Sequence, residues 1–451
     1  MSEVIRIKKG LDINLKGKAK EISAKVETSE LFSVRPDDFH GITPKVTVHE
    51  GDKVKVGTVL FYSKANPELK FVSPVSGEVI AVNRGDRRKV LDIRLKSDGQ
   101  FASESFSKVN PSSLSSDEVK EALLNAGYFA FIKQRPYDII ANPNDCPKAI
   151  FVSGFDSAPL APNYEYLMVG REEDFQFGVN TLAKLTKGKV HIGINAESAS
   201  KLYKGTQGVE LHEFIGPHPA GNVGVQIHHV DPINKGDIVW VVNAQDVAMI
   251  GAAFRTGQIT FGRSIVVAGS CVKKPAYYRV TVGECISNLV ADNVEGENLR
   301  YISGNPLTGT QIPSDGFLGA FDAQISVIPE GDKNNEFLGW IMPRLNKFSV
   351  NHSYFSWLLG KNKEYDIDTN INGGERAFIM SGEYDKVFPM DIYPEFLVKA
   401  ILAKDIDKME QLGIYEVAPE DFALCEFVCT SKIETQRIVR EGLDYLRKEL
   451  A

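Results

Sequence analysis

Hydrophobic and polar residues alternate along residues 42–95, and turn residues interrupt the alternation at short intervals. The string VTVHEGDKVKVGTVLFYSK has turn residues at Gly51, Asp52 and Gly57, and a second string with the same rhythm follows, FVSPVSGEVIAVNRGDRRKVLDI. Alternation with a period of two predicts β-strands, and the Gly and Asp residues predict the turns between them. We therefore expect residues 1–110 to form a β domain.

The two strings resemble the arms of the barrel-sandwich hybrid of biotinyl and lipoyl carrier domains, a GD-x-V-x-x-G-x-x-L arm followed by an SP-x-SG-x-V arm. A carrier holds its modified lysine in a tight hairpin between the arms. The intervening residues here are SKANPELK, in which Lys64 and Lys70 have no Met-Lys-Met or Asp-Lys-Ala setting. We expect the scaffold of a carrier domain without its swinging arm. Modification at Lys64 or Lys70 is an alternative that the intact mass would test.

Residues 111–261 alternate between apolar strands and amphipathic helices. A first helix is predicted from a capping box at Ser115 and Glu118 to a left-handed stop at Gly127. The following strands are AIFVSGF, KVHIGI and DIVWVV, and the helices carry apolar stripes through Phe175, Val179, Leu182 and Leu185, and through Val247, Ile250 and Phe254 before Gly257. This alternation predicts an α/β, Rossmann-like domain with a largely parallel sheet.

Strand and turn signals return at residues 262–330 and predict a second, smaller β domain. Residues 331–376 are expected to form a linker and irregular region, and residues 377–451 a helical domain. The last helix is predicted to begin with a capping box of Ser431 and Glu434. Its apolar stripe consists of Val439, Leu443, Leu446 and Leu450. The predicted fold class is therefore α+β and multidomain.

The composition limits the function. The 451 residues include 52 Lys and Arg against 59 Asp and Glu, and the net charge of −7 argues against nucleic acid as a partner. The N-terminus has no apolar signal core, and polar residues interrupt the most apolar long stretch, 238–254, so we expect no transmembrane segment. Five scattered cysteines do not resemble a disulfide framework and fit a reducing cytoplasm.

Strings from nearly the whole chain resemble the family of A subunits of the bacterial sodium-translocating NADH:quinone oxidoreductase. They are IKKGLDINLKG near the start, RPYDII (135–140), FDSAPLAP (155–162), GPHPAGNVGVQIHHVDPI (216–233), RVTVGECI (279–286), YISGNPLTG (301–309) and ALCEFVC (423–429). The domain order is also similar to the NADH- and flavin-binding subunit of respiratory complex I and to the C subunit of Rnf complexes. By this resemblance, residues 262–330 would be a soluble-ligand-binding (SLBB-like) β-grasp domain.

The resemblance implies a peripheral subunit on the cytoplasmic side of the bacterial inner membrane. The complex of this family has five other subunits, including membrane subunits, and it moves electrons from NADH to quinone while exporting sodium. Quinone would be the substrate, and the flavins, an iron centre and the NADH site would belong to the other subunits. The chain would take part in the reduction of quinone to quinol without a complete active site of its own.

Two cofactor motifs of the related flavoproteins are missing. Their flavin loop, Gly-Gly-Ala-Gly-Phe-Pro, is replaced by NAGYFAFIKQRP. The side chains of Tyr128, Phe129 and Phe131 would obstruct the approach to a phosphate that three glycines permit. Their iron–sulfur clusters need four thiolates, whereas this chain offers Cys425 and Cys429. We expect no flavin, cluster or metal on this chain. We interpret both cysteines as structural; the alternatives are a redox-labile pair or a site shared with another subunit.

The segment HEFIGPHPAGNVGVQIHH holds four of the eight histidines, beginning with His212. Nine residues rich in Gly and Pro separate His218 from His228, so the spacing defines no metal geometry. We expect a shaped loop before a strand of the α/β sheet, where ligands commonly bind. Quinone carbonyls need donors, and histidine can supply protons as quinol forms. The candidate quinone-binding residues are therefore His218, His228 and His229, with Arg135 as a further candidate, and we assign no catalytic residue.

The alternative function is a self-sufficient, flavin-dependent NADH dehydrogenase of the complex I type. A yellow preparation with flavin absorbance would favour it. The missing glycine loop and the absence of a G-x-G-x-x-G fingerprint after a strand argue against it.

Overall fold

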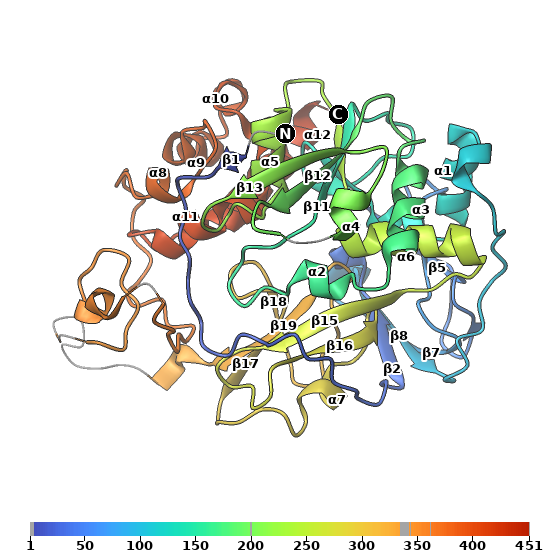
Figure 1. The fold of residues 1–451 in the computed structure, drawn as a ribbon, viewed down its shortest axis with the longest axis horizontal. Coiled ribbons are helices and arrows are strands. Elements are labelled where there is room, and N and C mark those ends of the chain that lie inside the picture. The colour runs from blue at the N-terminus through green and yellow to red at the C-terminus, as the bar shows by residue number, and fades with distance from the viewer. Residues whose placement is uncertain (1–3, 199–200, 334–341, 343, 361, 451) are drawn as a thin grey trace.

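The computed structural model describes residues 4–198, 201–333, 342, 344–360 and 362–450, and the strands of these residues form four sheets (Figure 1). A seven-stranded sheet lies in the upper half of the view and a five-stranded sheet in the lower half. The two remaining sheets form the first β region, and helices of the C-terminal region pack beside the seven-stranded sheet.

The first β region consists of a four-stranded and a three-stranded sheet, with the strand orders β2-β8-β7-β4 and β3-β5-β6. The strands are β2 (Leu31–Val34), β3 (Pro44–Val46), β4 (Lys53–Val54), β5 (Val59–Ser63), β6 (Lys70–Val72), β7 (Gly77–Arg84) and β8 (Val90–Ser97). The predicted alternation is confirmed in β8, where Ile93 and Leu95 are fully buried and Arg94 between them is exposed. The last strand of the second arm therefore has both buried and exposed side chains, and Ile93 and Leu95 belong to the core.

The α/β domain is built on the seven-stranded sheet, with the order β1-β13-β12-β11-β14-β9-β10. Its strands are β1 (Ile5–Arg6), β9 (Lys133–Arg135), β10 (Ile139–Ile140), β11 (Ala149–Ser153), β12 (Val190–Asn195), β13 (Glu210–Ile215) and β14 (Val239–Val241). The five strands from β1 to β14 in this order are parallel, and β9 and β10 add antiparallel strands at one edge. Because β1 pairs with β13, the first described residues belong to this sheet before the chain enters the first β region.

Two helices of this domain, α3 (Glu172–Leu182) and α6 (Ala244–Thr256), pack unusually close together. A Cβ at Gly178 would lie 1.9 Å from the carbonyl oxygen of Val247, and a Cβ at Gly251 would lie 1.8 Å from that of Asp174. Only glycine fits such a backbone-to-backbone approach. The domain also contains α1 (Ser116–Asn125), α2 (Tyr164–Leu167), α4 (Lys201–Gly205) and α5 (Val223–Val230).

The third domain is a five-stranded sheet with the order β16-β15-β19-β17-β18. Its elements are β15 (Gly262–Ala268), β16 (Ala276–Thr281), α7 (Ser287–Val290), β17 (Leu299–Ser303), β18 (Thr310–Ile312) and β19 (Gln324–Pro329). The C-terminal region contains α8 (Tyr384–Val387), α9 (Pro394–Leu402), α10 (Ile406–Gln411), α11 (Ala423–Val428) and α12 (Thr435–Leu450). Among the described helices, none is both long enough and apolar enough to cross a bilayer.

The two predicted capping boxes have different outcomes. The box of Ser115 and Glu118 is confirmed, because each side chain bonds the backbone N–H of the other residue at the start of α1. The box of Ser431 and Glu434 is wrong. The Ser431 hydroxyl instead accepts from the N–H of Ile379 and donates to the carbonyl of Ala377, so it fastens a remote segment, and α12 begins at Thr435.

The apolar stripe of α12 is confirmed for three of its four predicted positions. Val439, Leu443 and Leu446 are fully buried, whereas Leu450 at the end of the helix is exposed. The last turn therefore extends beyond the core that the rest of the helix covers.

An aromatic junction joins the three N-terminal domains. Phe39, just before the first arm, has its ring 4.7 Å from that of Phe71 and 6.4 Å from that of Phe61 in the first β region. The same ring lies 6.2 Å from that of Phe131 in the α/β domain and 5.7 Å from that of Phe321 in the third domain. Rings at these separations bury much apolar surface and add edge-to-face attraction. Phe39 therefore packs against side chains of three domains at once.

We predict that Phe39→Ala destabilises the whole chain, because the cavity it leaves lies between three domains. A buried Phe→Ala substitution costs about 3–5 kcal/mol. The matched control is Phe396→Ala in α9, whose ring is exposed. Thermal and urea unfolding of the purified chain would measure both variants. Equal midpoints for the two would contradict a central role for Phe39.

Candidate functional site

The GPHPAG loop leaves the carboxyl end of β13 and leads into α5, which contains both His228 and His229. The prediction of a strand after this loop is wrong. β13 is parallel to its neighbours, and the chain must return to the other end of the sheet before β14 can pair with β11 in parallel. Such a return needs a crossover, which is usually a helix. The loop itself lies, as predicted, at the carboxyl end of a parallel strand.

His218 is buried inside this loop, with 4% of its surface exposed. Its Nδ1 lies 3.0 Å from the hydroxyl oxygen of Ser157, which also accepts the N–H of Gly221 at 2.8 Å. The backbone N–H of His218 donates to Asp12 at 2.9 Å. Burial lowers the pKa of His218 to about 4, so its ring is neutral near pH 7. Three distant strings, IKKGLDINLKG, FDSAPLAP and GPHPAG, therefore meet at one neutral histidine.

His228 and His229 differ in how their ring nitrogens are used. His228 Nε2 accepts the N–H of Asp391 at 2.9 Å, so its proton is on Nδ1, which donates to the Glu416 carboxylate at 2.7 Å. Both nitrogens of His228 thus fasten α5 to the C-terminal region. His229 is exposed and donates from Nδ1 to the carbonyl of Val225 one turn earlier, at 2.8 Å. Burial of part of the ring lowers the pKa of His229.

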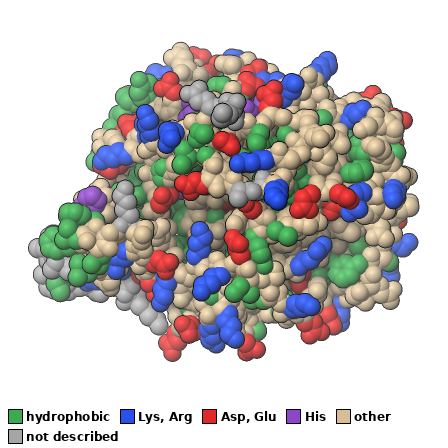
Figure 2. Space-filling model, in the orientation of Figure 1, with side chains coloured by type: hydrophobic (Ala, Val, Ile, Leu, Met, Phe, Trp, Pro, Cys, Tyr) green, Lys and Arg blue, Asp and Glu red, His purple; other side chains and the backbone are tan. Residues whose placement is uncertain are grey.

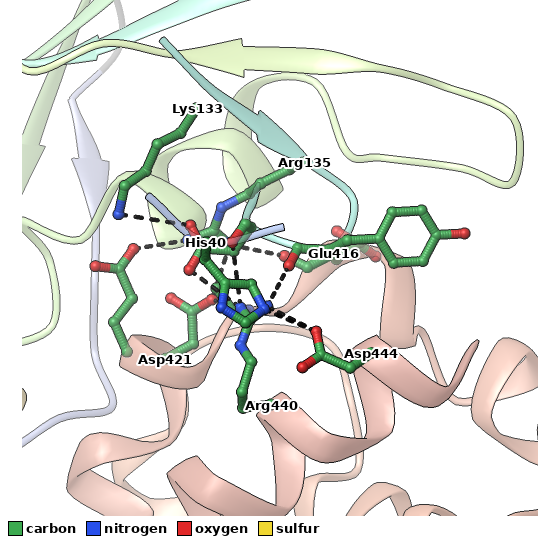
Figure 3. Close-up of polar contacts among 11 residues, drawn as sticks. His40, Lys133, Arg135, Glu416, Asp421, Arg440 and Asp444 are labelled. Atoms are coloured by element: carbon green, nitrogen blue, oxygen red, sulfur yellow. Dashed lines mark hydrogen bonds and ion pairs between the residues drawn. The ribbon is translucent and has the colours of Figure 1, made fainter. Parts of the chain in front are cut away.

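Arg135 lies at the end of β9, with 2% of its surface exposed, and points into the C-terminal region (Figure 3). Its guanidinium donates to the Asp421 carboxylate at 2.9 Å, to the Glu420 carboxylate at 2.7 Å and to the carbonyl of Glu416 at 3.0 Å. Burial alone would lower the pKa of Arg135, but the two carboxylates outweigh it and raise that pKa further. Arg135 is therefore a permanently charged group that is neutralised within the protein.

A second arginine extends this charged network towards the first β region (Figure 3). Arg440 of α12 donates to the Asp138 carboxylate at 3.2 Å and contacts Asp444 at 3.4 Å, and Asp444 bonds the ring of His40 at 2.8 Å. Burial opposes ionisation of Asp138, but the charges of Lys133 and Arg440 lower its pKa. The network thus connects the α/β sheet, the C-terminal helices and a loop of the first β region.

Residues 128–131, which follow Gly127, are part of the core. Tyr128, Phe129 and Phe131 lie in a 3₁₀ helix, and all three rings are buried. The Tyr128 hydroxyl donates to the carbonyl of Thr260 and accepts its N–H, at 3.1 and 2.9 Å. Gly127 has a left-handed φ of 77°, and a Cβ there would lie 2.5 Å from a methyl carbon of Val72. The glycine is thus required by packing against β6.

Cys425 and Cys429 are both buried, at α11 and immediately after it. The Tyr384 hydroxyl donates to Sγ of Cys429 at 3.0 Å. Burial, followed by the proximity of Cys429, raises the pKa of the Cys425 thiol well above its usual range. A protonated, buried thiol is a poor ligand and a poor nucleophile, which favours the structural interpretation of Cys425.

Sequence reasoning missed a cluster of residues of metal-ligating types. His191 of β12 lies against Glu210 and His212 of β13, in the one group of metal-ligating residues found within the described part of the chain. Part of the signal is visible in the sequence, because side chains two residues apart on a strand share a face, and Glu210 and His212 in ELHEFI are two residues apart. The pairing of β12 with β13, which brings in His191, has no signal in the sequence.

Models of known domains match three parts of the chain. The NqrA N-terminal barrel-sandwich hybrid domain matches residues 5–98, the NqrA second alpha/beta domain matches residues 114–259, and the NQRA C-terminal domain matches residues 264–314. The predicted fold class, with a barrel-sandwich hybrid, an α/β domain and an SLBB-like domain before the C-terminal helices, is thereby confirmed.

Full-length relatives are similar along the entire chain. The A subunit of the Na⁺-translocating NADH-quinone reductase of Photorhabdus laumondii is 37% identical over 450 residues, which cover 99% of this chain and 100% of the relative. The corresponding protein of Yersinia pestis is 36% identical with the same coverage. Among solved structures, a chain of an NAD⁺-reducing [NiFe]-hydrogenase in the H₂-reduced state has a TM-score of 0.38 and 12% identity, covering 77% of this chain and 67% of that one.

Identity at this level, continuous through every domain, does not arise from a shared fold alone. The predicted resemblance is confirmed: this chain belongs to the family of A subunits of the Na⁺-translocating NADH-quinone reductases.

Proposed function

We propose that this chain is the peripheral A subunit of a sodium-pumping NADH:quinone oxidoreductase, on the cytoplasmic side of the inner membrane. In that complex it takes part in the reduction of quinone to quinol, which is coupled to sodium export. The observation that carries the proposal is the identity of 36–37% over 99% of the chain and 100% of each relative. Five further subunits, including membrane subunits, are its partners.

The chain contributes to catalysis without flavin, NADH or an iron centre of its own, which the other subunits hold. Support comes from the buried aromatic segment 128–131, where packing against β6 and the third domain occupies the space that a phosphate-binding loop would need. A self-sufficient NADH dehydrogenase would need that loop open. No contact in the described residues favours this alternative.

The four candidate quinone-binding residues divide into two pairs by their contacts. Nη1 and Nη2 of Arg135 and Nδ1 of His228 donate to protein acceptors, so we assign these two residues to the joint between the α/β domain and the C-terminal region. His218 and His229 each have one ring nitrogen engaged by a protein group. We keep these two as the residues through which this chain contacts quinone.

An apolar projection supports contact with membrane subunits. The 3₁₀ helix Phe355–Leu359 lies on the segment that projects at the left of the molecule, where Figure 2 shows hydrophobic side chains gathered at the surface. Its exposed large side chains are those of Phe355, Trp357, Leu358 and Leu359, and Leu358 is 62% exposed. Exposed apolar groups in a cluster, rather than singly, mark interaction surfaces.

We predict that the other subunits co-purify with this chain and that the complex loses sodium-dependent quinone reduction when the chain is deleted. The isolated chain should be colourless. A yellow isolated chain, or full activity without it, would refute the proposed function.

We predict that replacing Trp357 and Leu358 by Ser reduces recovery of the membrane subunits several-fold, because it removes exposed apolar surface. Val169→Ser, at an exposed valine outside this cluster, is the control. Equal recovery with both variants would refute only the docking surface.

We predict that His218→Asn and His229→Gln each raise the KM for quinone in the assembled complex, with kcat less affected. One lost hydrogen bond is worth about 0.5–1.5 kcal/mol, which corresponds to a rise in KM of about 2- to 10-fold. His49→Gln is the control, because that ring lies at the surface of the first β region. Unchanged KM and inhibitor binding in both variants would rule out these residues.

We predict that Arg135→Met lowers the stability of the chain by about 3–5 kcal/mol, because it leaves the buried Asp421 carboxylate without a partner. The double variant Arg135→Met, Asp421→Leu should recover part of that loss. Urea unfolding measures the stability, and quinone kinetics of the assembled complex measure any binding role. A raised KM with unchanged stability would show that Arg135 is a quinone ligand instead of part of the joint.

A further inference from the structure

Two neighbouring strands of the α/β sheet place three metal-ligating side chains on one face. β12 and β13 are parallel, with His191 opposite Glu210 and Gly193 opposite His212. Successive side chains of a strand point to opposite faces, so Glu210 and His212, two residues apart, share a face with His191. All three lie at the amino ends of the strands, whereas the GPHPAG loop follows the carboxyl end of β13.

The ligand atoms converge at distances that suit one ion. His191 Nδ1 lies 3.0 Å from His212 Nε2 and 3.6 Å from a carboxylate oxygen of Glu210, and the three ligand atoms all lie within 4.8 Å of one another. Metal bonds of about 2.0–2.2 Å at angles of about 90–109° separate neighbouring ligand atoms by about 2.8–3.6 Å. Binding of an ion between these atoms therefore requires only a small movement of the more exposed side chains, those of Glu210 and His212.

The surroundings hold one ligand rigidly and leave another open to water. The ring of Phe151, on the adjacent strand β11, stacks on that of His191 with 4.6 Å between centroids and 15° between planes. His191 is buried, His212 is half-buried and the Glu210 side chain is 48% exposed. Water can thus complete the coordination shell on the exposed side. In known metal sites a hydrogen-bonded group often fixes the orientation of a ligating histidine. Here the stacked ring of Phe151 fixes the orientation of the His191 imidazole.

One cation competes for the carboxylate. Lys189 Nζ lies 4.0 Å from Oε1 of Glu210, whereas Oε2 is the oxygen that faces His191. The Lys189 side chain is largely exposed on a flexible stem, so the pair is screened by solvent. A lysine at this distance weakens the site but does not occupy the space between the three ligand atoms.

We propose that His191, Glu210 and His212 bind a divalent first-row transition ion, of which Zn²⁺ is the representative. Two imidazole nitrogens and one carboxylate oxygen form a ligand set that zinc uses in open sites, with water in the remaining position. Ca²⁺ and Mg²⁺ prefer shells made of oxygen ligands, so the two imidazoles exclude them. The bound ion clamps β12 to β13 independently of the quinone chemistry proposed above.

The test uses the purified full-length chain after removal of metals with a chelator. Titration with ZnCl₂ in a calorimeter should give one ion per chain, and Co²⁺ should produce visible d–d absorbance bands of a nitrogen- and oxygen-ligated ion. His212→Gln and Glu210→Gln, both at partly exposed positions, should each weaken Zn²⁺ binding at least about tenfold. Zn²⁺ should also raise the Tm of the parent chain more than that of either variant.

Two controls separate this site from adventitious binding. His49→Gln removes a highly exposed histidine and Cys146→Ser removes the exposed cysteine, and both should bind Zn²⁺ as the parent chain does. The proposal is overturned if the parent chain binds no ion, or if His212→Gln and Glu210→Gln bind as tightly as the parent. It is equally overturned if Cys146→Ser abolishes binding. In each of these outcomes His191 and His212 are simply a hydrogen-bonded pair.

Discussion

The burial of Phe39 among Phe71, Phe131 and Phe321 is the contact on which the arrangement of the N-terminal domains depends. Each of the three domains contributes an aromatic ring to the same space, so none can move without exposing a large apolar surface. The same packing turns residues 128–131 inward. One constraint therefore both aligns the domains and fixes residues 128–131 in the core.

A second joint, polar instead of apolar, holds the C-terminal region. The charged groups of Arg135 and Arg440 are largely buried between the α/β domain and the C-terminal region. Each forms ion pairs with carboxylates from the opposite side of this interface. A buried ion pair contributes little net stability compared with an apolar contact, but mispairing leaves a buried charge unmatched. Such a joint therefore selects one docking arrangement of the helices. This joint engages Arg135 through Nη1 and Nη2 and His228 through both ring nitrogens.

The errors of the sequence prediction share a physical origin. Ser431 has the residue type and spacing of an N-cap, but its hydroxyl finds partners in a segment more than fifty residues away. The composition of the GPHPAG loop predicts a strand after it, because local composition does not reveal that a parallel sheet requires a crossover there. Local patterns also do not indicate the partners of Arg135, because Glu420 and Asp421 lie almost three hundred residues further along the chain.

Sequence patterns predict much of the local structure, namely the alternating strands, the capping box of Ser115 and Glu118, and the stripe of α12. They also predict the family, because its signature strings are continuous in the chain. Such features depend on neighbours within a few residues, so pattern alone is sufficient. Contacts between polar groups from distant segments depend instead on the packing of the whole fold. The register of β12 against β13 brings His191 to Glu210 and His212, and domain docking buries Arg135. These contacts follow from packing free energy summed over the whole molecule, which no short segment encodes.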